Sequence, residues 1–172
     1  MPAASSPSSS VHDDLPADAA AVVDAGLDAA NGAAAALHEV RPLACFARLP
    51  SGVVVGGAVG RTWGACCELQ QLWVEPAQRR RGLATRLVRA FEARAQARGC
   101  RVFYLETFSF QAPALYRSLG YATRHVIEGF APGVAKFLML REIDAVPAEA
   151  DADPAQASKP ASRAGKAAAR KS

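Results

Sequence analysis

The sequence predicts an α+β domain, because a pair of strand-like segments is followed by a third strand, a glycine-containing turn and an amphipathic helix. Residues 43–49 and 53–59 flank a Pro-Ser-Gly turn, which predicts an antiparallel hairpin. Residues 66–74 read as the next strand. Residues 82–98 repeat apolar side chains at helical spacing and stop at a glycine, which predicts a helix.

The remaining segments add helices and strands on either side of this unit. Residues 16–31 are rich in alanine and begin with Pro16, which suits an early helical position, so they predict a first helix ending near Asn31 and Gly32. Further strands are predicted at residues 101–107, 121–127 and 136–140, and a short helix at residues 111–119.

The chain of 172 residues has the length of one domain, but its two ends lack core-forming side chains. Residues 1–13 are mainly Ser, Pro and Ala, and residues 145–172 are Ala, Pro, Ser, Lys and Arg without periodicity. Such segments cannot bury enough apolar surface to offset their chain entropy. We therefore expect a folded domain at residues 14–144 between two disordered ends.

Cysteine and histidine usage argues against a metal or disulfide scaffold. The four cysteines lack the paired spacing of a zinc site, and the three histidines are scattered. No uncharged apolar run is long enough to span a membrane, and the first ten residues do not resemble a signal peptide. We expect a cytoplasmic protein with reduced cysteines, without metal and without membrane attachment.

The turn before the helix at residues 82–98 is the most informative local feature. Arg79, Arg80 and Arg81 precede Gly82 where a strand meets a helix, so backbone N–H groups without intrahelical partners point out of the helix start. Gly82 has no side chain that would block the close approach of a phosphate to the backbone, and the small side chain of Ala84 leaves room in the same way. The turn predicts a phosphate-binding site.

Residues 74–84 resemble the coenzyme A loop of the GNAT family of N-acetyltransferases. That loop has Gln or Arg, two residues, Gly, one residue, then Gly or Ala after a strand ending in valine, matched here by Val74, Arg79, Gly82 and Ala84. The resemblance implies acetyl-CoA as co-substrate and no metal. The coenzyme-binding residues it implies are Leu72, Trp73, Val74, Arg79, Arg80, Arg81, Gly82, Leu83, Ala84 and Thr85.

A second stretch, residues 112–121, resembles the short tyrosine-bearing helix that follows this loop in the same family. The resemblance spans roughly residues 14–142 and is strongest at residues 68–121. It implies three layers, α/β/α, around a central, mostly antiparallel, splayed mixed sheet. It also implies that Tyr116 protonates the departing coenzyme A thiolate, for which a phenol is a suitable acid.

The base that deprotonates the amine has three candidates, two of them carboxylates. Glu68 stands eleven positions before Arg79, the offset at which histone-type members of the family have a glutamate base. Glu106, at the end of the next predicted strand, is the rival, and water is a third possibility. Direct attack in a ternary complex is favoured over an acyl-enzyme, although Cys66 and Cys67 beside Glu68 leave the latter open.

The resemblance therefore implies acetyl transfer to a primary amine of a small molecule or protein. The alternative is a noncatalytic acyl-CoA-binding or sensor protein that kept the loop. Binding of nucleic acid through the arginines and the basic end is least favoured, because no aromatic residues alternate with the basic ones. A homodimer is possible, and the acceptor amine has no recognisable sequence code.

Overall fold

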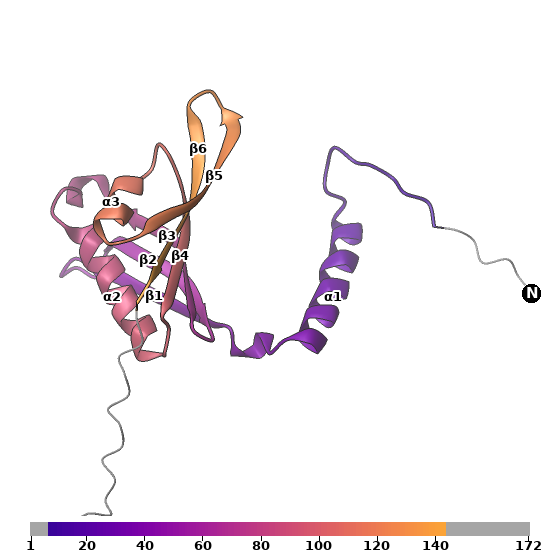
Figure 1. Ribbon diagram of the computed structural model, residues 1–172, viewed down its shortest axis with the longest axis horizontal. Coiled ribbons are helices and arrows are strands. Elements are labelled where there is room, and N and C mark those ends of the chain that lie inside the picture. The colour runs from indigo at the N-terminus through magenta and orange to yellow at the C-terminus, as the bar shows by residue number, and fades with distance from the viewer. Residues whose placement is uncertain (1–6, 144–172) are drawn as a thin grey trace, which may run out of the picture.

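The computed structural model describes residues 7–143, which form one mixed sheet with helices (Figure 1). Six strands lie in the order β1-β2-β3-β4-β6-β5. The strands are β1 (Arg41–Arg48), β2 (Val54–Trp63), β3 (Cys66–Val74), β4 (Val102–Phe108), β5 (Ala122–Ala131) and β6 (Val134–Glu142). The helices are α1 (Ala17–Ala34), α2 (Leu83–Ala97) and α3 (Pro113–Ser118), with short 3-10 turns η1 (Leu37–Glu39) and η2 (Pro76–Gln78). The predicted α+β class is confirmed.

The centre of the sheet has its one described parallel pair, between β3 and β4. This pairing covers only four positions and ends where Leu69 lies opposite Leu105. Beyond that point β3 continues to Val74 and β4 to Phe108 without a shared ladder. The two strands therefore splay apart at their carboxyl ends, while every other neighbouring pair in the sheet is antiparallel.

Helix α2 covers one face of the sheet and supplies much of the core. Its side chains Leu87, Val88, Phe91 and Ala95 recur at helical spacing and are all buried. Strands β2, β3, β4 and β6 bury residues against this helix layer, among them Ala58, Leu69, Phe103, Leu105 and Met139. The helix that the sequence predicted at residues 82–98 is present with nearly the same ends.

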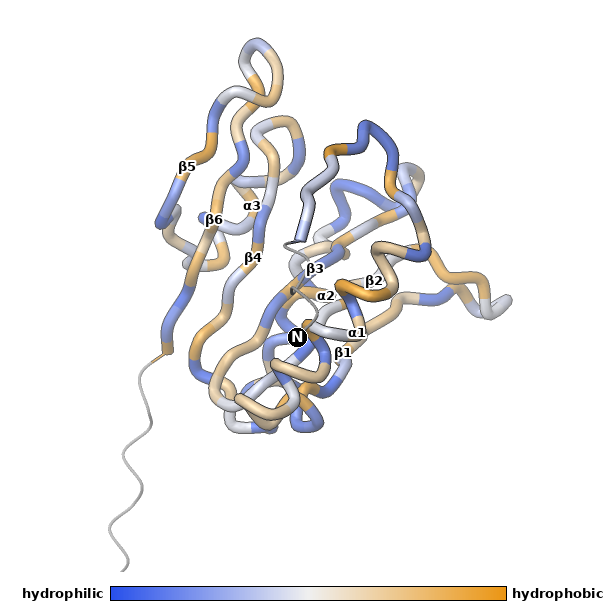
Figure 2. The backbone as a smooth tube through the Cα atoms, turned by 90° about the vertical axis from the view of Figure 1, so that its right-hand side faces the viewer, coloured by the Kyte–Doolittle hydropathy of each residue, from blue (hydrophilic) through white to orange (hydrophobic). Residues whose placement is uncertain are grey.

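Strand β2 runs four residues beyond the predicted end at residue 59. Gly60 is what lets the strand continue. A Cβ built on Gly60 would lie 1.9 Å from the carbonyl oxygen of Glu68, so only glycine permits β2 and β3 to approach at this bulged position. The β5–β6 hairpin is also longer than predicted and projects beyond the rest of the sheet (Figure 1, Figure 2).

The first helix ends three residues later than predicted and stands apart from the sheet (Figure 1). Gly32 does not stop it, because a glycine costs only about 1 kcal/mol in a helix and two alanines follow. None of its residues is buried, and Val22 remains 73% exposed. Residues 7–16 before it form neither helix nor strand, whereas the segment predicted to be disordered at residues 145–172 lies outside the described residues.

Among residues 7–143 no helix is both long and apolar enough to cross a membrane.

Candidate active site

The turn between β3 and α2 has a backbone conformation that lets a ligand approach it closely. Gly82, the residue before α2, has φ 72°, and Arg80 has φ 58°, so two residues of the turn adopt left-handed conformations. Side chains hold this shape from both ends. Arg79 Nε donates to the Val74 carbonyl at 2.9 Å, and Arg86 Nη1 donates to the Arg81 carbonyl at 2.9 Å.

The start of α2 lies open at this turn. No side chain caps its first N–H groups, and the helix dipole places partial positive charge there. A cavity of about 230 Å³ lies against it. Its lining consists of Val74, Gln78, Arg79, Arg80, Gly82, Leu83, Ala84, Thr85 and Leu115. Free amides, a missing side chain and arginines together suit a phosphate group.

A larger cavity of about 640 Å³ lies next to it, where β3 and β4 splay apart. Its lining consists of residues 69–74, Arg79, Ala84, Glu106, Thr107, residues 110–112, Leu115 and Tyr116. Val74, Arg79, Ala84 and Leu115 line both cavities. The structure thus brings most of the predicted coenzyme-binding residues together with Tyr116, while Arg81 lines neither cavity.

Backbone groups of β3 also face the larger cavity. The amide of Glu75 donates to the Val55 carbonyl at 2.9 Å, so it points toward β2. Amide directions alternate along a strand, so the amides of Val74 and Leu72 point to the opposite side, where β4 has already separated. These amides are available to a ligand in the cavity.

Tyr116, on α3, is held in an apolar setting. It is 7% exposed, and its ring packs edge-on against Tyr121 with centroids 6.0 Å apart. Burial raises the pKa of the Tyr116 phenol above its ordinary value. The polar contacts within residues 7–143 include none to its hydroxyl. The phenol is therefore protonated at neutral pH, on a residue that lines the larger cavity.

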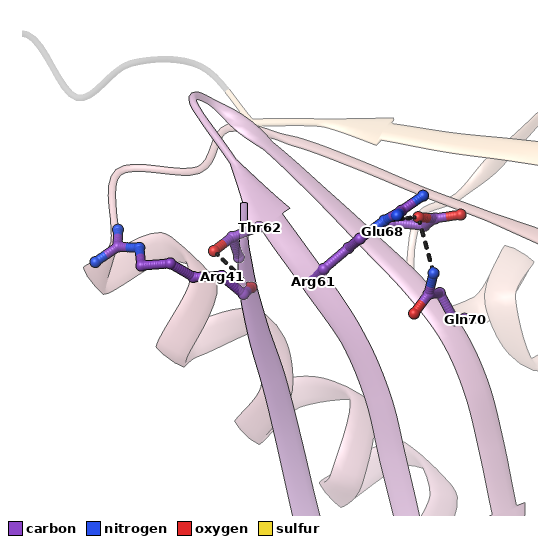
Figure 3. Close-up of polar contacts among 5 residues, drawn as sticks. All are labelled: Arg41, Arg61, Thr62, Glu68 and Gln70. Atoms are coloured by element: carbon purple, nitrogen blue, oxygen red, sulfur yellow. Dashed lines mark hydrogen bonds and ion pairs between the residues drawn. The ribbon is translucent and has the colours of Figure 1, made fainter. Parts of the chain in front are cut away.

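Glu68 lies outside that cavity. Its Oε2 accepts from Arg61 Nε at 2.6 Å and from Gln70 Nε2 at 3.2 Å (Figure 3). It lines a separate hollow of about 300 Å³ together with Leu37, Val40, Arg61, Trp63, Cys66 and Tyr104. The rival carboxylate, Glu106, lines the larger cavity with Tyr116 and pairs with Lys136.

Comparison with known proteins identifies the family. The family model described as "Acetyltransferase (GNAT) family" matches residues 13–121. The chain belongs to the GNAT acetyltransferases. A blasticidin-S acetyltransferase from Streptomyces morookaense is 35% identical over 109 residues, which cover 61% of this chain and 80% of that protein.

Solved structures of the same fold agree with this assignment. An acetyltransferase from Bacillus cereus superposes with a TM-score of 0.68 at 21% identity, covering 78% of this chain and 98% of that one. An aminoglycoside 6'-N-acetyltransferase in complex with coenzyme A gives a TM-score of 0.54 at 22% identity, covering 62% and 76%. The predicted GNAT resemblance is confirmed, and this GNAT protein is an acetyl-CoA-dependent N-acetyltransferase.

Several residues lining the GNAT cavity were missed by the sequence analysis, notably Gln71, Phe110 and Gln111. Gln111 shapes the loop after β4, because its Oε1 accepts from Thr107 Oγ1 at 3.1 Å and from the Phe108 amide at 2.8 Å. For Phe110 and Gln111 the signal was their position in the loop just after β4, because loops commonly carry binding residues, whereas Gln71 lies within β3.

The cysteines of this GNAT protein offer poor nucleophiles for an acyl-enzyme. Cys67 is buried, and burial, followed by neighbouring Cys100, raises the pKa of its thiol to about 12. Cys66 is exposed but lines the hollow that contains Glu68, away from Tyr116. Within residues 7–143 no three His, Cys, Asp or Glu side chains are grouped to hold a metal ion.

Proposed function

We propose that this enzyme acetylates a primary amine of a small molecule by direct attack on acetyl-CoA, with Tyr116 as the general acid. The observation behind the proposal is the junction of two cavities. One lies at the open start of α2, and the other is lined by Tyr116. A pyrophosphate bound in the first leaves the pantetheine arm to extend along β3 toward the second.

In this proposal the chemistry of the thioester uses two groups of the chain. The amide of Val74 or Leu72 donates to the carbonyl oxygen as the amine adds, and stabilises the negative charge that develops there. The Tyr116 hydroxyl gives its proton to the sulfur as the C–S bond breaks. Desolvation raises the pKa of the tyrosine, and the same surroundings raise the pKa of a departing thiol, so their acidities stay close.

Glu106 is the better placed of the two carboxylates to take the proton of the amine. It lines the cavity of Tyr116, whereas Glu68 lines the neighbouring hollow and accepts hydrogen bonds from Arg61 and Gln70. Lys136 pairs with Glu106, so a cationic amine has to displace this lysine or give its proton to Glu106 through a water molecule. In this scheme Glu68 orders the adjacent stretch of β3 rather than acting on the amine.

The acceptor proposed is a small amine attached to a flat ring. A cavity of about 640 Å³ has the size of sites for drug-sized ligands. Trp73 and Phe110 line it and are 48% and 69% exposed, which offers aromatic faces for stacking. The similarity to a blasticidin-S acetyltransferase supports a small-molecule acceptor over a protein. A homodimer and a cytoplasmic location stay predictions.

The test is a panel of ring-bearing amines, aminoglycosides, polyamines and peptides, assayed for coenzyme A release. On the best acceptor, Tyr116→Phe should lower kcat by about 100-fold to 10,000-fold while acetyl-CoA affinity stays within a few fold. Glu106→Gln should lower kcat and shift its dependence on pH, whereas Glu68→Gln should leave that pH dependence in place. Unchanged kcat in a folded Tyr116→Phe protein would remove Tyr116 from the mechanism.

A further inference from the structure

A carboxylate lies in the core of the domain, on the helix that begins at the coenzyme turn. Glu92 of α2 is 2% exposed, although most carboxylates stay at the surface. Its Oε1 accepts from the Tyr121 hydroxyl at 2.7 Å, and its Oε2 accepts from Arg141 Nη1 at 2.6 Å. The three side chains come from α2, from the turn after α3 and from β6.

Stability alone is a weak reason for this arrangement. The free energy needed to remove a carboxylate and a guanidinium from water is about as large as the free energy of their attraction. Apolar side chains of similar size often stabilise a core equally well. A charged pair with fixed hydrogen bonds does select a single arrangement of the elements it joins. Burial and the charge of Glu92 raise the pKa of Tyr121, so its hydroxyl remains a donor.

The network reaches Tyr116 through Tyr121. The Tyr121 amide donates to the Tyr116 carbonyl at 3.0 Å, and the two rings meet edge-on at an interplanar angle of 70°. Gly120, between them, turns with φ 91° beside the Arg141 side chain. A shift of Tyr121 therefore moves both the backbone and the ring against which Tyr116 is packed.

We propose that Glu92 and Tyr121 are positioning residues that fix the Tyr116 hydroxyl relative to coenzyme A bound at the start of α2. Glu92 lies on the same rigid helix as the coenzyme turn, so its bond to Tyr121 ties the acid to the element that binds the coenzyme. This inference rests on the proposed role of Tyr116 as the acid. It adds the physical link that sets the distance between acid and sulfur.

A double-mutant cycle tests the link. Tyr121→Phe removes one hydroxyl and keeps the ring, so acetyl-CoA KM should stay within about two-fold while kcat falls by about 10-fold or more, as expected for a displaced catalytic group. In a Tyr116→Phe background there is no acid left to position. Adding Tyr121→Phe there should lower kcat by less than two-fold, which a purely structural role would not produce.

Thr62→Val is the matched control, because Thr62 is a buried residue whose hydroxyl also joins a strand to α2. Its Oγ1 accepts from Arg98 Nη1 at 3.1 Å near the far end of that helix. This variant should lower the melting temperature without changing kcat per folded molecule. If Tyr121→Phe fails to fold, Glu92→Gln replaces it in the cycle, with the same expected loss of kcat and the same absence of effect beside Tyr116→Phe.

Two results would overturn the inference. Full turnover in folded Tyr121→Phe and Glu92→Gln would show that neither residue positions the acid. Losses that multiply with that of Tyr116→Phe would show that they act independently of it. Failure of the proposed acid itself has a different signature, since Tyr116→Phe alone would then keep full turnover.

Discussion

Replacing Gly82 with asparagine or with aspartate distinguishes the effect of charge on acetyl-CoA binding from the effect of side-chain volume. A Cβ at this position meets nothing closer than Arg86 Nη1 at 3.6 Å, which is ordinary van der Waals contact. Both replacements put a non-glycine residue at φ 72°, which costs about 1 kcal/mol of folding stability, and asparagine and aspartate tolerate this region better than other residues. The two variants therefore differ in one negative charge.

That charge sets the expected size of the effect. A carboxylate about 5 Å from a phosphate, at an effective dielectric constant of about 20, raises the binding free energy by roughly 3 kcal/mol, or more than 100-fold in Kd. The arginines around the turn offset part of this penalty. We expect Gly82→Asp to bind acetyl-CoA at least 30-fold more weakly than Gly82→Asn, and the gap to narrow at high salt.

The assay is isothermal titration calorimetry of acetyl-CoA against the wild type and both variants, with melting temperatures measured in parallel. Gly82→Asn should stay within about 10-fold of the wild-type Kd, because it adds volume without charge. Equal affinities for the asparagine and aspartate variants, at low salt and with both proteins folded, would show that no phosphate approaches this turn.

Three further predictions concern stability. Gly60→Ala should prevent folding or lower the melting temperature sharply, because the alanine Cβ would overlap the Glu68 carbonyl oxygen. Gly26→Ala on α1 is the control: a Cβ there has no atom within 4 Å, so thermal denaturation should show an unchanged or raised melting temperature. Burial raises the pKa of the Cys67 thiol to about 12, against an ordinary value of 9.0, so between these pH values the thiol is neutral in the folded protein and ionised in the unfolded chain. The free energy of unfolding is therefore full below pH 9 and declines by up to about 4 kcal/mol as pH rises toward 12. Urea unfolding across that range should show a shallower decline in Cys67→Ala. Truncation after residue 146, outside the described residues, should leave the melting temperature nearly unchanged, and a large loss would mean that the tail docks on the domain.

Local patterns in the sequence predicted the strand and the helix on either side of the coenzyme turn well. Strand β3 has the predicted bounds at Cys66–Val74, and α2 differs from its predicted range by one residue at each end. Both depend on signals within a few residues: alternation along the strand, helical spacing in the helix, and Gly82 between them. The phosphate site predicted at this turn, made of backbone amides, depends on the same short stretch.

The acceptor half could not be predicted in this way, because it depends on register between distant segments. Glu68 lies opposite Tyr104 within the last paired positions of β3 and β4, so it faces the hollow next to Arg61 rather than the cavity. Glu106, two residues further along β4, falls past the end of the ladder and into the cavity. A difference of a few residues in where pairing stops decides which carboxylate lines the cavity of Tyr116.

The end of that ladder links the fold to the proposed chemistry. Past Leu69, strand β3 keeps its pairing with β2, as the alignment of Leu72 with Ala58 shows, but has lost β4 on its other edge. Amides that would complete a continuous sheet are thereby left for the thioester carbonyl. The same separation opens the space that Tyr116 enters from α3. In the proposed mechanism this one interruption of pairing supplies both free amides for the thioester and room for the acid, so a change that extended the β3–β4 ladder should remove both together.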